Sequence, residues 1–270
     1  MIIGGEKMAT VYIQGEEGFI CDYTERKKGW LMNNMHYHTT YELFVMVSGK
    51  TAIMTEDNIF KLQRGDVVLF RKNALHKNNG GTDHGRYTVN FSDKYLREHF
   101  TQSAAEELLG CFEYDKIIVP RRYQGYAFAL LRRMEQKGSE FAFLSAFLGM
   151  LKDCVAEMPV KTEKVENDIN IVLEYINENF KNIEKIDEIA EAAHTSKSYL
   201  CQKFKRCTGM TVTEYLNSVR IKNACEMLES GNMNVSETAQ ECGYSTSAYF
   251  CKVFREIVKM TPSEFRRFEI

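Results

Sequence analysis

The sequence lacks several features that would place it in a specialised class. Only three prolines occur in 270 residues, and no low-complexity stretch is present, which leaves little room for long disordered linkers. No apolar run approaches the roughly eighteen residues of a membrane-spanning helix. The opening MIIGGEKMAT also lacks a basic stretch ahead of an apolar core. We therefore expect a cytoplasmic protein with no signal peptide and no membrane partner.

Cysteine spacing excludes two further classes, and the net charge indicates no particular partner. None of the eight cysteines forms a CxxC pair, so we expect scattered reduced thiols rather than a disulfide framework or a zinc ribbon. The net charge is −2 and the pI is about 6.3, so the overall charge does not indicate nucleic-acid binding. A hydrophobic content of 44% with 27% charged residues is typical of a soluble chain, and the length allows two domains.

What is present is a repeat within residues 186–266. Phe204 matches Phe254 fifty positions later, whereas Ala190 matches Ala239 forty-nine positions later. One residue has therefore been added at the turn between these two points. A repeat of this length is one supersecondary unit used twice.

Each copy predicts a short helix, a tight turn and a second helix, at residues 186–207 and 235–258. Ser196 is the expected cap of the second helix in the first copy. In the second copy Gly243 supplies the turn and Ser245 is the expected cap. Acidic residues gather on the leading helices and basic residues on the following helices. That pattern favours two helix-turn-helix units whose second helix enters the major groove, over the alternative of two solvated amphipathic helix pairs.

Residues 168–270 resemble the DNA-binding domain of the AraC/XylS family of bacterial transcription regulators. The resemblance is carried by Ala190, Ser196, Tyr199, Leu200, Phe204, Lys205, Gly209, Tyr215, Ala239, Gly243, Tyr244, Tyr249, Phe250, Phe254, Arg255 and the run Thr261 to Arg266. Lys259 departs from it, because it stands where the family has the glycine seen at Gly209. We expect this change to alter the exit of the last recognition helix. The resemblance implies a partner of double-stranded promoter DNA, and RNA polymerase as a further partner if the protein activates transcription.

Exposed positions of the two recognition helices are the expected DNA contacts. Early positions that can reach base edges are Lys197, Ser198, Tyr199 and Gln202 in the first helix and Thr246, Ser247, Tyr249 and Lys252 in the second. Phosphate contacts are expected from Lys203, Lys205, Arg206 and Arg255. Tyr199 and Tyr249 have an alternative role as core residues. A long helix between the units, at about residues 211–230, would space the recognition helices for successive major-groove faces.

The first hundred residues show a period of two, which is typical of strands. Residues 41–49, 51–55, 59–62, 67–70 and 86–91 read as short strands separated by turn residues. This spacing predicts a small β-barrel or jelly roll. The overall expectation is an α+β multidomain chain, with an N-terminal β-barrel and a C-terminal all-α domain.

Four residues of this barrel can meet at one point, namely His36, His38, Glu42 and His76. His36 and His38 share one face of an extended segment, and such a set suits a divalent transition metal. The pattern HxHxxxE resembles the first cupin motif, whereas Arg71 and Asn73 depart from the second. The quartet can hold a metal, line a ligand pocket without metal, or be a structural remnant.

We interpret the quartet as part of an effector pocket, because arabinose-type regulators with this motif resemble cupins but use the barrel to bind sugars or other effectors. The expected effector-binding residues are His36, His38, Tyr41, Glu42, His76 and Trp30. No cofactor is required on this interpretation. The metal alternative uses His36, His38, Glu42 and His76.

The middle of the chain is expected to be helical and to pair two chains. Helices are predicted at residues 93–109, 123–137 and 140–158, and the last is more apolar than a surface helix needs. It can cover the barrel or bury against the same helix of a second subunit, and we expect a homodimer. The predicted domains are 1–100 for the effector-binding barrel, 101–160 for the helical segment, 161–167 for a linker and 168–270 for DNA binding.

The sequence therefore predicts a transcription regulator that responds to a small, sugar-like effector, and not an enzyme. The alternative is a metal-binding cupin, acting as a metal sensor or as a metal-dependent enzyme, fused to a DNA-binding domain. The effector, the target promoters and the sign of regulation are not encoded in any motif. Whether Cys201 and Cys251 have a redox role is equally open.

Overall fold

The structure is a computed structural model that describes residues 18–32, 35–136, 140–157 and 168–268. The predicted linker at 161–167 lies outside these residues. Within the described ranges, every helix is too short or too polar to cross a membrane.

Two antiparallel sheets form the N-terminal region in the part of the chain that the structure describes, as the sequence predicts. The five-stranded sheet has the order β1 (Phe19–Arg26), β7 (His84–Phe91), β2 (Tyr41–Ser48), β5 (Asp66–Phe70) and β8 (Lys116–Ile118). The three-stranded sheet has the order β4 (Ile59–Gln63), β3 (Lys50–Met54) and β6 (Lys77–Gly81). Strand β8 comes from the segment that was expected to be helical, and it pairs with β5.

The five-stranded sheet is buried on both faces. Leu43 and Val45 point toward a core shared with the helices, while Phe44 and Met46 point toward Ile53 of the facing sheet. Side chains alternate along a strand, so neighbouring residues enter different cores. The inner face also carries a polar group. Glu42 is two residues from Phe44 on the same strand, so its side chain points to the same side of the sheet.

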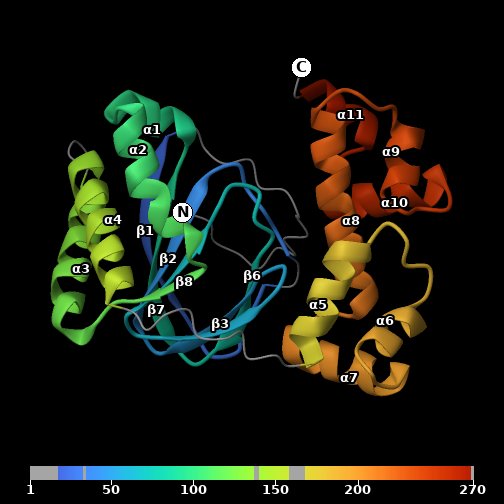
Figure 1. Cartoon of the computed structure of the whole chain (residues 1–270), viewed down its shortest axis with the longest axis horizontal. Helices are drawn as coiled ribbons and strands as arrows, with labels where there is room; N and C mark the ends of the chain where they lie inside the picture. Colours follow the sequence, from blue (N-terminus) through green and yellow to red (C-terminus); the bar gives the residue numbers. More distant parts are fainter. Residues whose placement is uncertain (1–17, 33–34, 137–139, 158–167, 269–270) are drawn as a thin grey trace.

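Helices cover the outer face of this sheet (Figure 1). They are α1 (Asp93–His99), α2 (Gln102–Leu109), the 3₁₀ turn η1 (Gly110–Glu113), α3 (Arg121–Met134) and α4 (Glu140–Ala156). Ser92 caps α1 by accepting a hydrogen bond from the backbone N of Tyr95 at 3.1 Å. The prediction of one helix over 93–109 was wrong, because α1 ends at His99 and Thr101 caps a new helix.

The apolar excess of α4 is explained by packing within the chain. Leu144, Phe147, Leu148 and Leu151 are fully buried in the core under the sheet. Most of the apolar surface that suggested an intersubunit contact therefore covers the sheet.

The C-terminal region is all-helical within residues 168–268. Its helices are α5 (Asp168–Asn179), α6 (Ile186–Ala192), α7 (Lys197–Thr208), α8 (Val212–Glu229), α9 (Val235–Glu241), α10 (Ser247–Val258) and α11 (Pro262–Phe268). Figure 1 shows α8 as the long element, with α6 and α7 beside one end and α9 and α10 beside the other. The two helix-turn-helix units and the connecting helix are thus where the sequence predicts them.

The two units differ at two equivalent positions where the backbone is left-handed. At each position one unit has glycine and the other has a bulkier residue. At the turn, His194 has φ +49° in the first unit and Gly243 has φ +77° in the second. At the end of the recognition helix, Gly209 has φ +72° and Lys259 has φ +68°. Our expectation that Lys259 alters the exit of α10 was wrong, because it adopts the same left-handed cap as Gly209.

The β-sheet region and the helical C-terminal region share one hydrophobic core. Met35, Tyr37, Met54 and Leu75 are buried in the cluster formed by the residues of α5 to α11. The turn between β3 and β4 adds a polar anchor at Glu56. Its carbonyl accepts from the Tyr215 hydroxyl at 2.7 Å, and its carboxylate pairs with Lys222 Nζ at 2.6 Å.

Candidate DNA-binding surface and sensor site

The first recognition helix, α7, presents the predicted contact residues to solvent. Ser196 caps it by accepting from the backbone N of Tyr199 at 3.3 Å. The exposed predicted residues are Lys197, Ser198, Tyr199, Gln202, Lys205 and Arg206, whereas Lys203 is half-buried. Lys197 Nζ lies 2.8 Å from a carboxylate oxygen of Asp187 on α6, and Lys203 Nζ lies 5.2 Å from the centre of the Tyr199 ring.

The second recognition helix, α10, begins one residue later than expected. Thr246, and not Ser245, caps it by accepting from the backbone N of Tyr249 at 3.3 Å. The extra residue of the second copy therefore lies between the left-handed Gly243 and the cap. Thr246, Tyr249, Lys252 and Arg255 are exposed and Ser247 is half-buried.

Both tyrosines of the recognition helices lie at the surface. Tyr199 is 48% exposed and Tyr249 is 47% exposed, so the alternative reading of them as core residues was wrong. Their neighbours Leu200 and Phe250 are the ones that enter the core. Each helix thus carries an exposed aromatic ring beside its basic side chains.

Helix α8 connects the two units with eighteen residues, which span about 27 Å at 1.5 Å per residue. Adjacent major-groove faces of a duplex are about 34 Å apart. A capping box at Thr211 and Glu214 fixes the start of α8, and Gly231 with φ +71° follows its end.

The sensor quartet converges between the two sheets. His36 and His76 form a β-bridge through both backbone hydrogen bonds, each 2.9 Å long. Glu42 Oε2 lies 2.7 Å from His38 Nε2 and 3.8 Å from His76 Nε2. One ring nitrogen from each histidine lies within 4.8 Å of those of the other two. All four side chains are buried, with exposures between 2% and 8%.

Backbone carbonyls orient two of these rings. His38 Nδ1 lies 2.9 Å from the Thr40 carbonyl and His76 Nδ1 lies 2.8 Å from the Ala74 carbonyl. If each Nδ1 donates its proton, both Nε2 atoms direct a lone pair toward Glu42. A lone pair facing a carboxylate at 2.7 Å is repulsive unless His38 carries a second proton or a cation lies between them.

The charges inside the quartet shift the pKa values in opposite directions. Burial lowers the pKa of His38, but the hydrogen bond and the charge of Glu42 outweigh it and leave that pKa raised. Burial favours neutral Glu42, yet the hydrogen bond with His38 and the nearby His76 ring hold its pKa well below the usual value. Burial and the neighbouring His76 push the pKa of His36 well below its usual value.

The quartet has the donor atoms that a transition-metal ion requires. His36 Nδ1 and His76 Nε2 are buried and lack a hydrogen-bond partner among the described residues. Three imidazole nitrogens and one carboxylate form a common donor set for divalent zinc, iron or nickel.

The other predicted effector residues are divided between the two faces of the sheet. Tyr41 is not brought to the quartet, because on the helix-covered face it stacks on Phe91 at 5.4 Å and meets Phe112 edge-to-face at 5.2 Å. Trp30 is half-buried, and the guanidinium carbons of Arg26 and Arg86 lie 4.6 and 5.2 Å from its ring centre. Sequence reasoning missed both arginines. The alternation of Arg86, Thr88 and Asn90 with apolar residues was the available signal.

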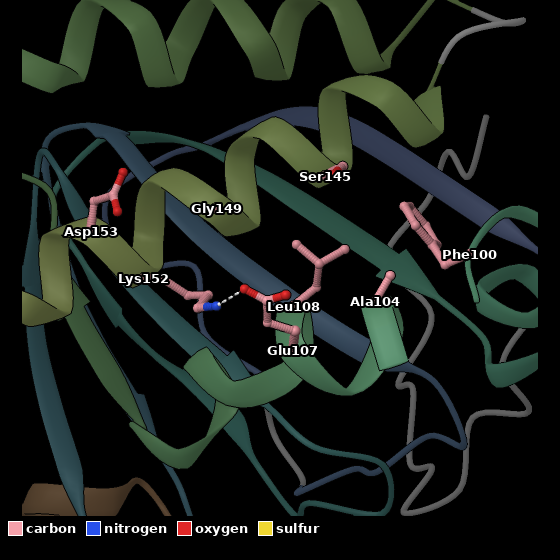
Figure 2. A pocket seen from close by; sticks show the side chains of 8 residues that line it. All are labelled: Phe100, Ala104, Glu107, Leu108, Ser145, Gly149, Lys152 and Asp153. Carbon is pink, nitrogen blue, oxygen red and sulfur yellow. Dashed lines mark hydrogen bonds and ion pairs between the residues drawn. The ribbon is translucent and has the colours of Figure 1, made fainter. Parts of the chain in front are cut away.

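A separate surface pocket of about 370 Å³ lies between α2 and α4. Figure 2 shows the Lys152–Glu107 ion pair, 2.8 Å long, across one side of it. Its lining residues are Phe100, Ala104, Glu107, Leu108, Ser145, Gly149, Lys152 and Asp153. None of the predicted effector residues lines this pocket.

Comparison with known proteins agrees with the C-terminal geometry. Residues 189–267 match the family described as a helix-turn-helix domain. The transcriptional activator RhaR of Escherichia coli K12 is 37% identical over 81 residues, which are 30% of this chain and 29% of RhaR. The Msm operon regulatory protein of Streptococcus mutans is 25% identical over 134 residues, 48% of each chain. The chain spans about half the length of the curated relatives it matches, or less.

Among solved structures, ToxT of Vibrio cholerae O395 is similar at 17% identity with a TM-score of 0.37, over 93% of this chain and 97% of that one. The C-terminal region of this chain is a helix-turn-helix domain, present as two units on one connecting helix. Over this region the chain is therefore similar to proteins named as transcription regulators.

Proposed function

We propose that the chain binds promoter DNA through α7 and α10, and that a small molecule in the β-sheet region controls this binding. The observation that carries the proposal is the exposure of two basic recognition helices on one spacer helix. The contacts of Glu56 and Tyr37 with the C-terminal region supply a physical connection between sensor and reader. A ligand that binds one arrangement of this interface more tightly would shift the equilibrium between the arrangements of the two regions. Promoter DNA is the primary partner, with RNA polymerase a further one if the protein activates.

Base readout and phosphate binding are separable in α7. We expect Gln202→Ala to relax specificity at one base pair, at a cost of about 1–3 kcal/mol, because a glutamine amide pairs with adenine in the major groove. Lys205→Ala should weaken binding to every sequence alike and reduce the salt slope by about one ion. Fluorescence anisotropy with a selected operator and a scrambled duplex measures both effects.

Lys61→Ala provides the matched control, because Lys61 is an exposed lysine on β4, outside the recognition helices. It should leave both affinities unchanged. Equal losses on operator and scrambled DNA for Gln202→Ala and Lys205→Ala would contradict the division of roles. Absence of DNA binding by the unmodified chain would contradict the proposed function itself.

A second proposal concerns the quartet, which we infer to be a metal site. The buried, unpartnered nitrogens of His36 and His76 support it, because such atoms cost free energy unless a ligand satisfies them. A metal sensor fused to a DNA reader, or a metal-dependent enzyme fused to one, would use the same residues. When bound, the ion would join His36, His38, Glu42 and His76 and tie three segments of the inner face together.

Metal content of the purified chain tests the quartet directly. We expect one equivalent of a divalent ion by mass spectrometry and a chelator-sensitive rise in melting temperature. His76→Gln should abolish both effects, whereas His99→Gln, on the surface helix α1, should abolish neither. A metal-free chain whose melting temperature is indifferent to zinc, nickel and cobalt would contradict the metal site.

We also propose a homodimer formed through the pocket between α2 and α4. Tyr126 and Phe141, which are 53% and 41% exposed, lie on the same helical layer and add apolar area. Gly149→Trp should fill the pocket, so light scattering should report a monomer for that variant and a dimer for the unmodified chain. A monomeric unmodified chain at high micromolar concentration would contradict the dimer.

A further inference from the structure

The inner face of the five-stranded sheet holds a group of hydrogen-bond donors without acceptors. Arg86 is 9% exposed, yet its Nε and Nη1 are buried without a hydrogen-bond partner among the described residues. Arg26 Nε is in the same condition. Buried guanidinium groups are normally paired, since an unpaired buried charge is costly.

Strand register brings these donors together. Thr24 lies opposite Arg86 and Arg26 lies opposite His84 in the antiparallel β1–β7 pair. Residues opposite one another share a face, so Arg26, His84 and Arg86 project to the same side of the sheet. Met46 lies opposite Arg86 on β2 and belongs to the core between the sheets. The donors therefore point into the interior.

Two arginines also share one aromatic ring. Both guanidinium carbons lie within 5.2 Å of the centre of Trp30, and that of Arg86 lies 4.7 Å from the centre of Phe44. Burial and the charge of Arg26 lower the pKa of Arg86 to about 10. The opposing charge is Glu42, whose Oε2 already lies 2.7 Å from His38. Positive charge thus exceeds negative charge at Trp30.

We propose that Arg26 and Arg86, with Trp30 beside them, bind the carboxylate or phosphate group of a small anionic metabolite. A guanidinium fork offers parallel donors that match two oxygens of such a group. Arg26 and Trp30 are only partly buried, so an anion bound beside them can reach solvent. The indole offers a stacking surface for the rest of the metabolite. This inference rests on the proposed control of DNA binding by a small molecule and names the chemistry of that molecule.

Trp30 is the single tryptophan of the chain, so its emission reports this site alone. Sodium glucuronate, glucose 6-phosphate and glucose form the probe set, titrated at an ionic strength held constant with NaCl. We expect a saturable change in emission with at least one anion and none with glucose at the same concentrations. Comparing glucuronate with glucose 6-phosphate distinguishes a carboxylate ligand from a phosphate ligand.

Arg86→Gln should weaken the responding anion roughly ten- to hundredfold, because it removes charge-assisted hydrogen bonds. Arg86→Lys keeps the charge without the fork and should lose less. Arg121→Gln, an exposed arginine at the start of α3, should change nothing. Far-UV circular dichroism checks that each variant is folded, and Arg26→Gln provides a second test should Arg86→Gln be unfolded.

The proposal is overturned if neither anion changes the emission saturably, if glucose acts as strongly as glucuronate, or if a folded Arg86→Gln or Arg26→Gln variant keeps full affinity. DNA binding without any anion is measured on the same preparations. Its absence in the unmodified chain would refute the proposed function, whereas its presence without an anion response would refute the anion site only.

Discussion

Replacing Lys259 by glycine should stabilise the protein, whereas replacing the equivalent Gly209 by alanine should destabilise it. Both residues end a recognition helix in the left-handed region, at φ +68° and +72°. A residue with a Cβ pays about 1–2 kcal/mol there. Glycine avoids that strain. It also lowers the free energy of unfolding by about 0.5–1 kcal/mol, because the unfolded chain has more conformational freedom. The net gain for Lys259→Gly should be about 0.5–1 kcal/mol.

The surroundings of Gly209 make the comparison clean. A Cβ built there would lie 3.5 Å from Asn79 Oδ1 and 3.5 Å from Lys77 Nζ, which are ordinary contacts. The expected loss of about 1 kcal/mol for Gly209→Ala therefore reflects φ and not a clash. At the turn, where the residue types are exchanged, His194→Gly should likewise be stabilising.

Urea unfolding at 25 °C, followed by far-UV circular dichroism, measures these differences as shifts of the midpoint at constant slope. A Lys259→Gly variant that is as stable as the unmodified chain, or less stable, would refute the strain argument. Loss of the exposed hydrogen bond from Lys259 Nζ to the Glu256 carbonyl is too weak to reverse the sign. Lys259→Ala serves as the control, because it removes the same bond and keeps the Cβ.

Three further substitutions follow from the same packing and are checked by the same unfolding assay. Gly243→Ala should cost about 3 kcal/mol or more, because φ is +77° and its Cβ would lie 2.2 Å from the Lys181 carbonyl oxygen; retention of full stability would contradict the turn geometry. Tyr215→Phe should cost about 1 kcal/mol by removing the hydroxyl that donates to the Glu56 carbonyl, and no loss would mean that this bond does not hold the two regions together. Gly125→Ala, with open space around its Cβ in the middle of α3, should gain about 0.5–1 kcal/mol, and a loss would contradict that packing.

Helical periodicity and cap chemistry predicted most of the C-terminal region. Ser196, Gly209 and Gly231 mark helix ends because their conformational preferences act locally. The cap of α10 was misplaced by one residue, since Ser245 and Thr246 offer the same hydroxyl and only the length of the turn decides between them. The left-handed Lys259 shows that tertiary packing can impose a conformation that the residue itself disfavours.

The cluster of His36, His38, Glu42 and His76 was predicted in part, for a different physical reason. The period of two placed His36, His38 and Glu42 on one face, and the structure brings them together. The sequence pattern did not show which face of β2 points toward the second sheet and which toward the helices, because both faces are buried. Tyr41 was consequently grouped with Glu42, although neighbouring residues in a strand face opposite cores. Arg86 was missed, because a polar residue on alternating positions normally indicates a solvated face.

The segment from Met35 to His38 has a consequence for building chimaeras of this protein. His36 and His38 belong to the quartet with Glu42 and His76. Met35 and Tyr37, which alternate with them, are buried in the core of the DNA-binding region. The Tyr37 side chain also interacts with the Cys225 thiol of α8. A fusion that joins residues 168–270 to a foreign sensor would leave an unfilled site on α5 and α8. Exchange of sensors between relatives should therefore carry the odd-numbered residues along with the DNA-binding region, and vary only the even-numbered ones.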